Sequence, residues 1–155
     1  MTHGSATEGS AEIFERGPSV VVVLLEGDSA VLVQQWREAV GAETVELVQE
    51  RLEPGELPFQ AAARGVAEEC AVRASGWEEH GSFWAVPAYS TQRVHVFSAT
   101  VEARLPVDGP RSTQLVHCEP ADLDLLLDDA VSIAGLSVFR RSTSVRAAPG
   151  AERAD

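Results

Sequence analysis

The carboxylates between Glu46 and Val72 are the residues of this chain whose types and spacing are best suited to chemistry. The segment combines a strand end, a tight acidic loop closed by Pro54-Gly55, and a helix that carries Arg64, Glu68 and Glu69. Carboxylates placed this close together repel one another unless a cation or an arginine offsets their charge. The pattern therefore predicts a metal-assisted site for a phosphate compound.

The segment resembles a Nudix box, G-x5-E-x7-R-E-U-x-E-E-x-G-U, where U is a bulky apolar residue. The positions that agree with this pattern are Glu56, Arg64, Val66, Glu68, Glu69 and Val72. Three positions depart from it: Glu50 replaces the opening glycine, Gly65 replaces the glutamate after the arginine, and Ala71 replaces the late glycine. The resemblance implies a fold of the α/β (α+β) class, with a mixed, twisted β-sheet sandwiched between helices.

The resemblance also implies a reaction, in which water attacks a nucleoside diphosphate linked to another group while Mg²⁺ or Mn²⁺ neutralises the phosphate oxygens. In such boxes the glutamate after the arginine and the last glutamate share one helix face and chelate the metal. Gly65 removes the first of these two carboxylates, so the resemblance implies an impaired or rearranged site, in which Glu50 could place a carboxylate in the vacated space. The candidates are Glu68, Glu69 and Glu50 for catalysis, and Glu69, Glu68 and Glu53 for the metal. For each of them, a solvated surface carboxylate is the alternative.

Two further segments resemble the ADP-ribose pyrophosphatase branch of the same family. They are Gln35-Trp36-Arg37, followed by the strand end at Glu46, and the run YSTQR, which contains Gln92. The resemblance implies that Arg37, Trp36, Glu46 and Gln92 bind substrate. A planar guanidinium can bind two oxygens of a diphosphate. For Arg37 the alternative is a surface ion pair with Glu38 or Glu43.

Other residues are weaker candidates or have a structural role. Glu56 and Arg64 pair in Nudix boxes and hold the loop against the helix, so we expect that role here. Trp36 and Trp84 could stack on a base or a ribose, although tryptophans are more often buried in a core. His95 is expected to pack within a strand. Asp108 is the acidic residue offered by the loop between the last two strands.

The composition limits the possible partners. The chain has 155 residues, with 24 acidic against 12 basic ones, and a formal charge of −12 argues against binding DNA or RNA. The chain contains no lysine, which excludes Schiff-base chemistry and a P-loop, and we attribute this bias to a GC-rich bacterial genome. No apolar run of about 18 residues is present. We therefore expect a cytoplasmic protein that does not enter a membrane, with Cys70 and Cys118 reduced.

The pattern of apolar residues predicts the elements that must position these side chains. The β-branched run at 19–25 and the run at 30–35 predict a hairpin around a strand that is buried on both faces. The further strands are expected at 44–48, 74–83, 93–101 and 114–118, and the helices at 58–69, 119–127 and 130–140. We expect one domain over 12–140, with disordered ends at 1–11 and 141–155.

Three functions are compatible with these observations. The first is a hydrolase of an ADP-sugar-like diphosphate, the second a non-catalytic module that binds a nucleotide or a protein, and the third an enzyme for a non-nucleotide diphosphate. The family branch also implies a homodimer. Because a glycine inside a helix costs about 1 kcal/mol relative to good helix formers, Gly65→Glu is expected to stabilise the helix.

Overall fold

The strand β1 (Ser19–Glu26) lies at the centre of a mixed seven-stranded sheet. The computed structural model describes residues 12–106 and 113–147. β1 runs parallel to β6 (Arg93–Arg104) along one edge. Along its other edge it pairs antiparallel with β4 (Val48–Arg51) over its first half and with β2 (Ser29–Arg37) over its second half. The two partners of this edge change near Val23.

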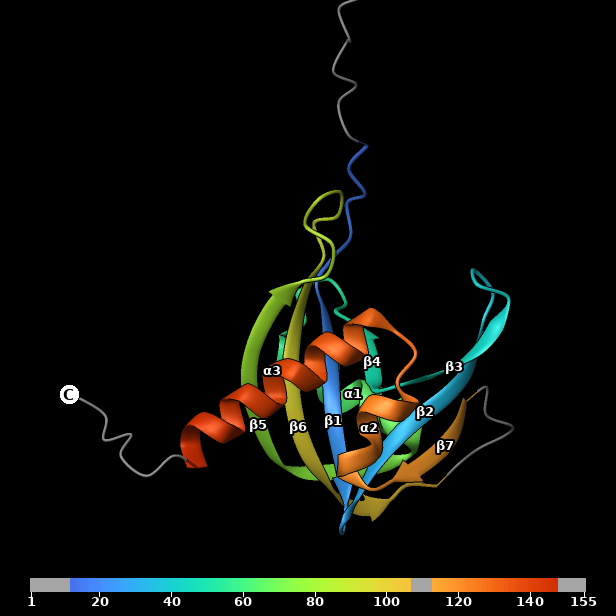
Figure 1. Ribbon diagram of the computed structural model, residues 1–155, viewed down its shortest axis with the longest axis vertical. Coiled ribbons are helices and arrows are strands. Elements are labelled where there is room, and N and C mark those ends of the chain that lie inside the picture. The colour runs from blue at the N-terminus through green and yellow to red at the C-terminus, as the bar shows by residue number, and fades with distance from the viewer. Residues whose placement is uncertain (1–11, 107–112, 148–155) are drawn as a thin grey trace, which may run out of the picture.

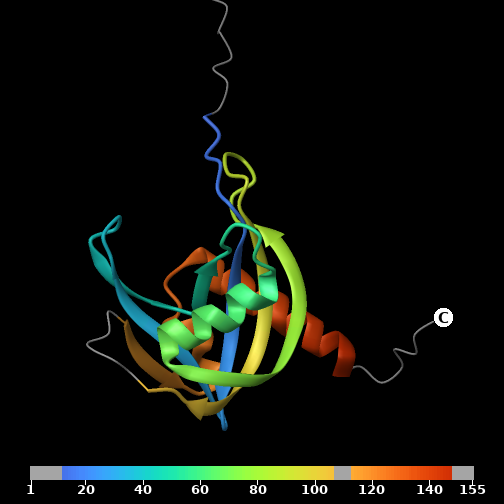
Figure 2. The same ribbon diagram turned by 180° about the vertical axis from the view of Figure 1, so that it is seen from behind.

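The remaining strands extend the sheet on both sides. β2 also pairs antiparallel with β3 (Ala42–Glu46) and with β7 (Thr113–Cys118), and β6 pairs antiparallel with β5 (Val72–Trp84). Figure 1 shows α3 (Ala130–Ala147) crossing one face of the sheet, and Figure 2 shows α1 (Pro58–Cys70) crossing the other. The short helices η1 (Pro120–Asp122) and α2 (Leu123–Leu126) lead from β7 to α3. The expected mixed sheet between helices is confirmed.

Alternation along β1 divides the interior into two cores. Val20, Val22 and Leu24 pack on the α1 side, whereas Val21 and Val23 pack on the α3 side, and all five are fully buried. Successive side chains of a strand point to opposite faces, so a strand buried on both faces is apolar throughout. This is why the β-branched run predicted from the sequence forms the centre of the sheet.

The helix α1 begins and ends through local backbone preferences. Pro58 occupies the first turn, where its missing N–H is no loss, and the Leu57 N–H donates to the Gln60 side chain at 2.9 Å. The helix ends at Ala71, whose φ of 47° is left-handed. Its N–H donates to the carbonyl of Ala67, a common way for a helix to terminate.

The last helix corrects one prediction. We expected it to end near Arg140 and the tail to be disordered from 141, but α3 continues to Ala147. The extension is attached to the sheet, because the Ser142 hydroxyl lies 2.6 Å from Nδ1 of His80 and Phe139 packs edge-on against the His80 ring. Composition alone missed this tertiary contact. The expected disorder at 1–11 and 148–155 concerns residues outside the described ranges.

The other expected elements are present with shifted ends. The strand expected at 44–48 is two strands, β3 and β4, separated by the buried Leu47. The strand expected at 74–83 spans Val72–Trp84, and the helix expected at 119–127 is η1 followed by α2. Among the described residues, no helix has the length and hydropathy needed to cross a membrane.

Candidate active site

A cleft of about 520 Å³ opens beside the start of β1, between the end of β2, β4 and the C-terminal end of α1. Its walls carry charges of both signs, since two arginines and two glutamates line it. The lining residues are Ser19, Gln35, Arg37, Gln49, Glu50, Arg51, Glu69, Gln92 and Val131. The fold thus brings together Arg37, Glu50, Glu69 and Gln92, four of the residues predicted from the sequence.

Glu69 is the carboxylate in this cleft whose environment is least favourable to its own charge. Its Oε2 is buried and has no hydrogen-bond partner in the structure. Burial, and then the nearby charge of Glu50, raises the pKa of Glu69 above its usual range, although the charge of Arg37 opposes this. An ionised oxygen without a partner is unfavourable. A cation bound in the cleft would supply the missing interaction.

Arg64 organises the acidic loop and the helix. Its guanidinium donates to both oxygens of Glu56, at 3.0 and 2.9 Å, and to the carbonyl of Arg51 at 2.8 Å. The pairing expected for Glu56 and Arg64 is therefore present. Arg64 also lies 3.3 Å from the Glu50 carboxylate and 3.5 Å from that of Glu68. The Glu68 side chain is 61% exposed, and Glu68 is not a lining residue of the cleft.

Arg37, which is partly exposed, forms a bidentate ion pair with the buried Glu46 beside the cleft. The Arg37 Nε donates to Glu46 Oε1 at 2.7 Å and its NH2 group donates to Oε2 at 2.5 Å, while the Thr44 hydroxyl donates to Oε1 at 2.6 Å. Burial raises the pKa of Glu46, but these hydrogen bonds and the Arg37 charge outweigh it, so the pKa is lowered. Arg37 thus pairs with Glu46 instead of Glu38 or Glu43. Glu46 is 3% exposed, so it is connected to the cleft through Arg37 and through the Gln49 amide, which donates to its Oε2 at 3.3 Å.

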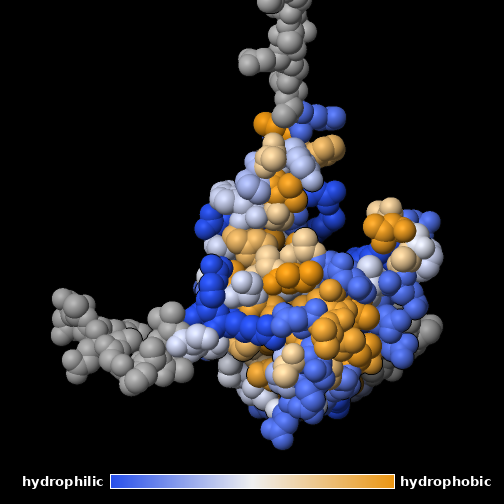
Figure 3. All heavy atoms as spheres, in the orientation of Figure 1, coloured by the Kyte–Doolittle hydropathy of each residue, from blue (hydrophilic) through white to orange (hydrophobic). Residues whose placement is uncertain are grey.

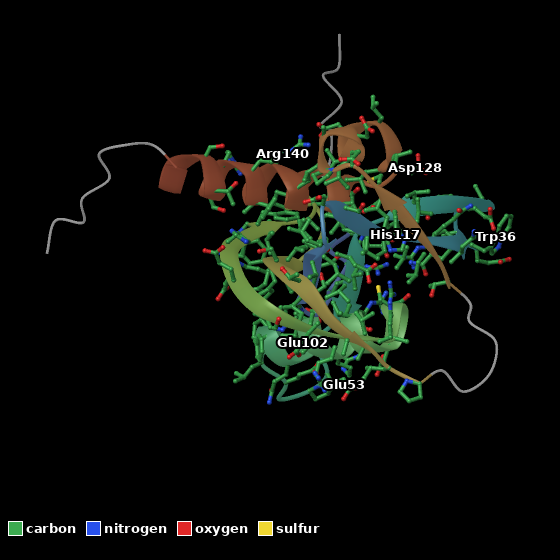
Figure 4. All side chains as sticks on the ribbon, turned by 90° about the horizontal axis from the view of Figure 1, so that it is seen from below. Trp36, Glu53, Glu102, His117, Asp128 and Arg140 are labelled. Carbon is green, nitrogen blue, oxygen red and sulfur yellow. The ribbon has the colours of Figure 1, made fainter. Side chains whose placement is uncertain are left out.

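The remaining candidates lie away from the cleft. Trp36 points outward from the β2–β3 hairpin (Figure 4), and its Nε1 donates to Glu38 at 2.9 Å. Glu53 is exposed on the loop before α1. Trp84 is 50% exposed and stacks with the Arg93 guanidinium 4.9 Å from its ring centre. Asp108 lies outside the described residues.

Sequence reasoning missed several polar residues of the cleft: Ser19, Gln35, Gln49 and Arg51. Gln49 connects the site to α3, because its amide donates to Asp129 at 2.9 Å and to Ser132 at 3.1 Å. Gln92 is held in turn by its bond to Ser19, at 3.0 Å. Alternation along β4 places Gln49 and Arg51 on the face opposite Val48 and Glu50. Because residues of both faces line the cleft, strand periodicity gave no signal for them.

The family model for the NUDIX domain matches residues 15–136. The chain belongs to the NUDIX family. An ADP compounds hydrolase of known structure is similar, with 18% identity, a TM-score of 0.73, and coverage of 83% of this chain and 74% of that one. A NUDIX hydrolase from Nitrosomonas europaea is also similar, with 18% identity, a TM-score of 0.67, and coverage of 81% and 88%. These likenesses establish the NUDIX fold, and a comparison with curated protein sequences found no match.

NUDIX hydrolases generally use a divalent metal ion, and the cleft fits one. The observation that supports this fit is the buried, unpartnered Oε2 of Glu69 in a cleft that Glu50 also lines. In the described ranges, no group of three or more His, Cys, Asp and Glu is placed to hold a metal. Two carboxylates are sufficient for Mg²⁺, because this ion keeps several waters and takes further ligands from substrate phosphates.

Proposed function

We propose that this NUDIX protein is a hydrolase that uses Mg²⁺, or Mn²⁺ in its place, to cleave an ADP-sugar-like nucleoside diphosphate. The observation that carries the proposal is the unpartnered carboxylate oxygen of Glu69 in a cleft that also presents Arg37 and Arg51. Acidic groups suit the cation, and guanidinium groups suit the phosphates. The similar ADP compounds hydrolase supports a substrate of this class.

Several residues of the cleft have a defined task in this proposal. The Nε and NH2 groups of Arg37 donate to Glu46, which fixes the guanidinium. The other N–H groups of Arg37 can then donate to a diphosphate. Ser19 holds Gln92 at the cleft wall. A bound divalent ion would neutralise phosphate oxygens and favour ionisation of a water molecule. Glu69 contributes as a carboxylate, so its protonation at low pH opposes the reaction.

The direct test is hydrolysis of ADP-ribose in the presence of Mg²⁺ or Mn²⁺. Addition of one water across the diphosphate yields AMP and a sugar phosphate, which chromatography separates. Glu69→Gln removes the charge while retaining the shape, so we expect activity to fall at least about a hundredfold, the scale of losing a strong electrostatic contact. Parent protein that leaves ADP-ribose and related ADP-sugars intact with either metal would contradict the proposal.

A non-catalytic binding module is the second candidate. It is favoured by Gly65, which leaves the helix without the carboxylate one turn before Glu69. Calorimetry distinguishes the two functions. A module that binds ADP-ribose equally well with and without metal, and releases no product, would support the second.

We also propose a homodimer. Three exposed aromatic side chains lie near the end of the molecule where the N-terminal segment meets the β5–β6 loop, a region in which hydrophobic and hydrophilic residues are interspersed (Figure 3). They are Phe14, Trp84 and Tyr89, which are 51%, 50% and 48% exposed. Phe14 and Tyr89 also contact each other edge-on, with ring centroids 6.3 Å apart. Exposed aromatic side chains are enriched at protein interfaces.

A further inference from the structure

Glu50 and Gly65 face each other where β4 packs against α1. A Cβ atom built on Gly65 would lie 2.7 Å from the Cβ of Glu50 and 3.2 Å from its Cγ. Two carbon atoms that are not bonded to each other require about 3.5 Å or more. The space at this crossing therefore accepts a side chain from position 50 or from position 65, but not from both.

The direction of the Glu50 side chain follows from strand alternation. Val48 packs in the core on the α1 side, and Glu50, two residues later on β4, points to the same face. Glu50 is also held in place, because its Oε1 accepts the Arg51 N–H at 2.8 Å and its Oε2 lies 3.3 Å from Arg64. Its position is thus determined by the sheet and by two polar contacts.

The Glu50 carboxylate reaches the place that a side chain at position 65 would occupy. Its Oε2 lies 3.8 Å from the Cβ built on Gly65. Residues one turn apart on a helix lie on one face, so this place is next to Glu69 on the surface of α1. Glu50 and Glu69 both line the cleft.

We propose that Glu50 and Gly65 are a reciprocal exchange, in which Glu50 supplies from β4 the metal-binding carboxylate that position 65 of α1 lacks. The inference rests on the proposed function, because it assigns a ligand for the same cation. It also corrects the expectation that Gly65→Glu would stabilise the helix in every case. With Glu50 present, any side chain at position 65 meets the Glu50 Cβ, and this contact outweighs the gain in helix propensity.

Binding of Mn²⁺ alone, measured by calorimetry and by electron paramagnetic resonance, tests the ligand assignment. Glu50→Gln and Glu69→Gln should each weaken Mn²⁺ binding at least about tenfold. Glu102→Gln is the matched control, since Glu102 is a half-exposed carboxylate of β6 that pairs with Arg73, and it should leave the affinity unchanged. Unchanged affinity in Glu50→Gln, with a loss in Glu69→Gln, would overturn the exchange and leave the proposed function intact. Absence of Mn²⁺ binding by the parent protein, with or without ADP-ribose, would overturn both.

Thermal unfolding without metal tests the steric half of the inference. Gly65→Ala and Gly65→Glu should lower the unfolding temperature of the parent protein. In the Glu50→Gly background the same changes should raise it, because the space is vacated and a helix glycine is replaced. The double variant Glu50→Gly, Gly65→Glu should also recover Mn²⁺ binding to within a few-fold of the parent. Equal effects of Gly65→Ala in the two backgrounds, or a double variant that folds but binds no Mn²⁺, would contradict the exchange.

Discussion

Ala71 closes α1 in a conformation that suits glycine. Its φ of 47° places the Cβ against the following carbonyl, and its side chain is 7% exposed. The late glycine of the Nudix box falls at this position, and here an alanine occupies a backbone conformation that favours glycine. Ala71 thus carries local strain that the surrounding structure maintains.

Ala71→Gly should therefore stabilise the protein. Relief of the left-handed strain contributes about 1 kcal/mol, partly offset by the greater freedom of glycine in the unfolded chain. Urea unfolding at constant pH measures the effect. Ala67→Gly, four residues earlier inside the same helix, is the control and should destabilise by about 1 kcal/mol. Destabilisation by both substitutions would refute the strain argument.

In the absence of metal, Glu69 should make a contribution to the free energy of unfolding that decreases as pH rises. Its pKa is raised in the folded state, chiefly by burial, so the folded protein holds a proton that the unfolded chain releases near the ordinary value of 4.5. In the pH range between these two pKa values, the free energy of unfolding contributed by Glu69 falls as pH rises, and it stays low above that range. Glu69→Gln should remove this decline and raise the metal-free unfolding temperature at pH 7.

Added Mn²⁺ separates this electrostatic effect from a general change in packing. It should raise the unfolding temperature of the parent protein at pH 7 and do so less at pH 5, because protons compete for Glu69. At both pH values, Mn²⁺ should raise the unfolding temperature of the Glu69→Gln variant less than that of the parent. An equal gain in the two proteins would show that Glu69 is not involved.

At the scale of elements, His80 joins α3 to the sheet. The imidazole side chain is fully buried, with Nε2 lying 2.7 Å from the Ser98 hydroxyl and Nδ1 lying 2.6 Å from that of Ser142. A neutral imidazole offers one donor and one acceptor, which two hydroxyl groups can satisfy. Burial lowers the pKa of His80, although Glu78 lies 3.9 Å from Nε2.

His80 therefore predicts a loss of stability in mild acid. The unfolded chain binds a proton near the ordinary pKa of 6.5, whereas the folded protein does so only at lower pH. The free energy of unfolding should fall as pH decreases from 6.5 to the folded-state pKa. His80→Gln should flatten this slope, while His117→Gln, on β7 with a side chain 41% exposed, is the control. Equal pH dependence in parent and His80→Gln would contradict the prediction.

At the scale of the whole molecule, the exposed aromatic side chains Phe14, Trp84 and Tyr89 predict self-association. Sedimentation at micromolar concentration should show a species of about twice the 16.6 kDa chain mass. Replacing both Trp84 and Tyr89 with serine should shift it to the monomer, because aromatic side chains dominate interfaces. Trp36→Ser, which alters an aromatic residue on the distant β2–β3 hairpin, should not. A parent protein that sediments only as a monomer would refute the homodimer.

The sequence alone determined the core and the acidic loop. The β-branched run around Val22 favours a strand that is buried on both faces of a sheet, and Pro58 followed by helix-forming residues favours the start of a helix. These are local properties of the chain. The pairing of Glu56 with Arg64 could also be expected, since both residues occupy fixed positions of one motif.

Only the tertiary structure decided the rest. The sequence suggested that Glu50 could compensate for Gly65, but only the packing of β4 against α1 brought the two positions into steric conflict. Arg37 found its partner in Glu46 on the neighbouring strand, and α3 was extended by His80, far away in sequence. Such contacts depend on the distance between elements, which hydrophobic periodicity does not encode. The register of the strands and the packing of the helices against the sheet set these distances.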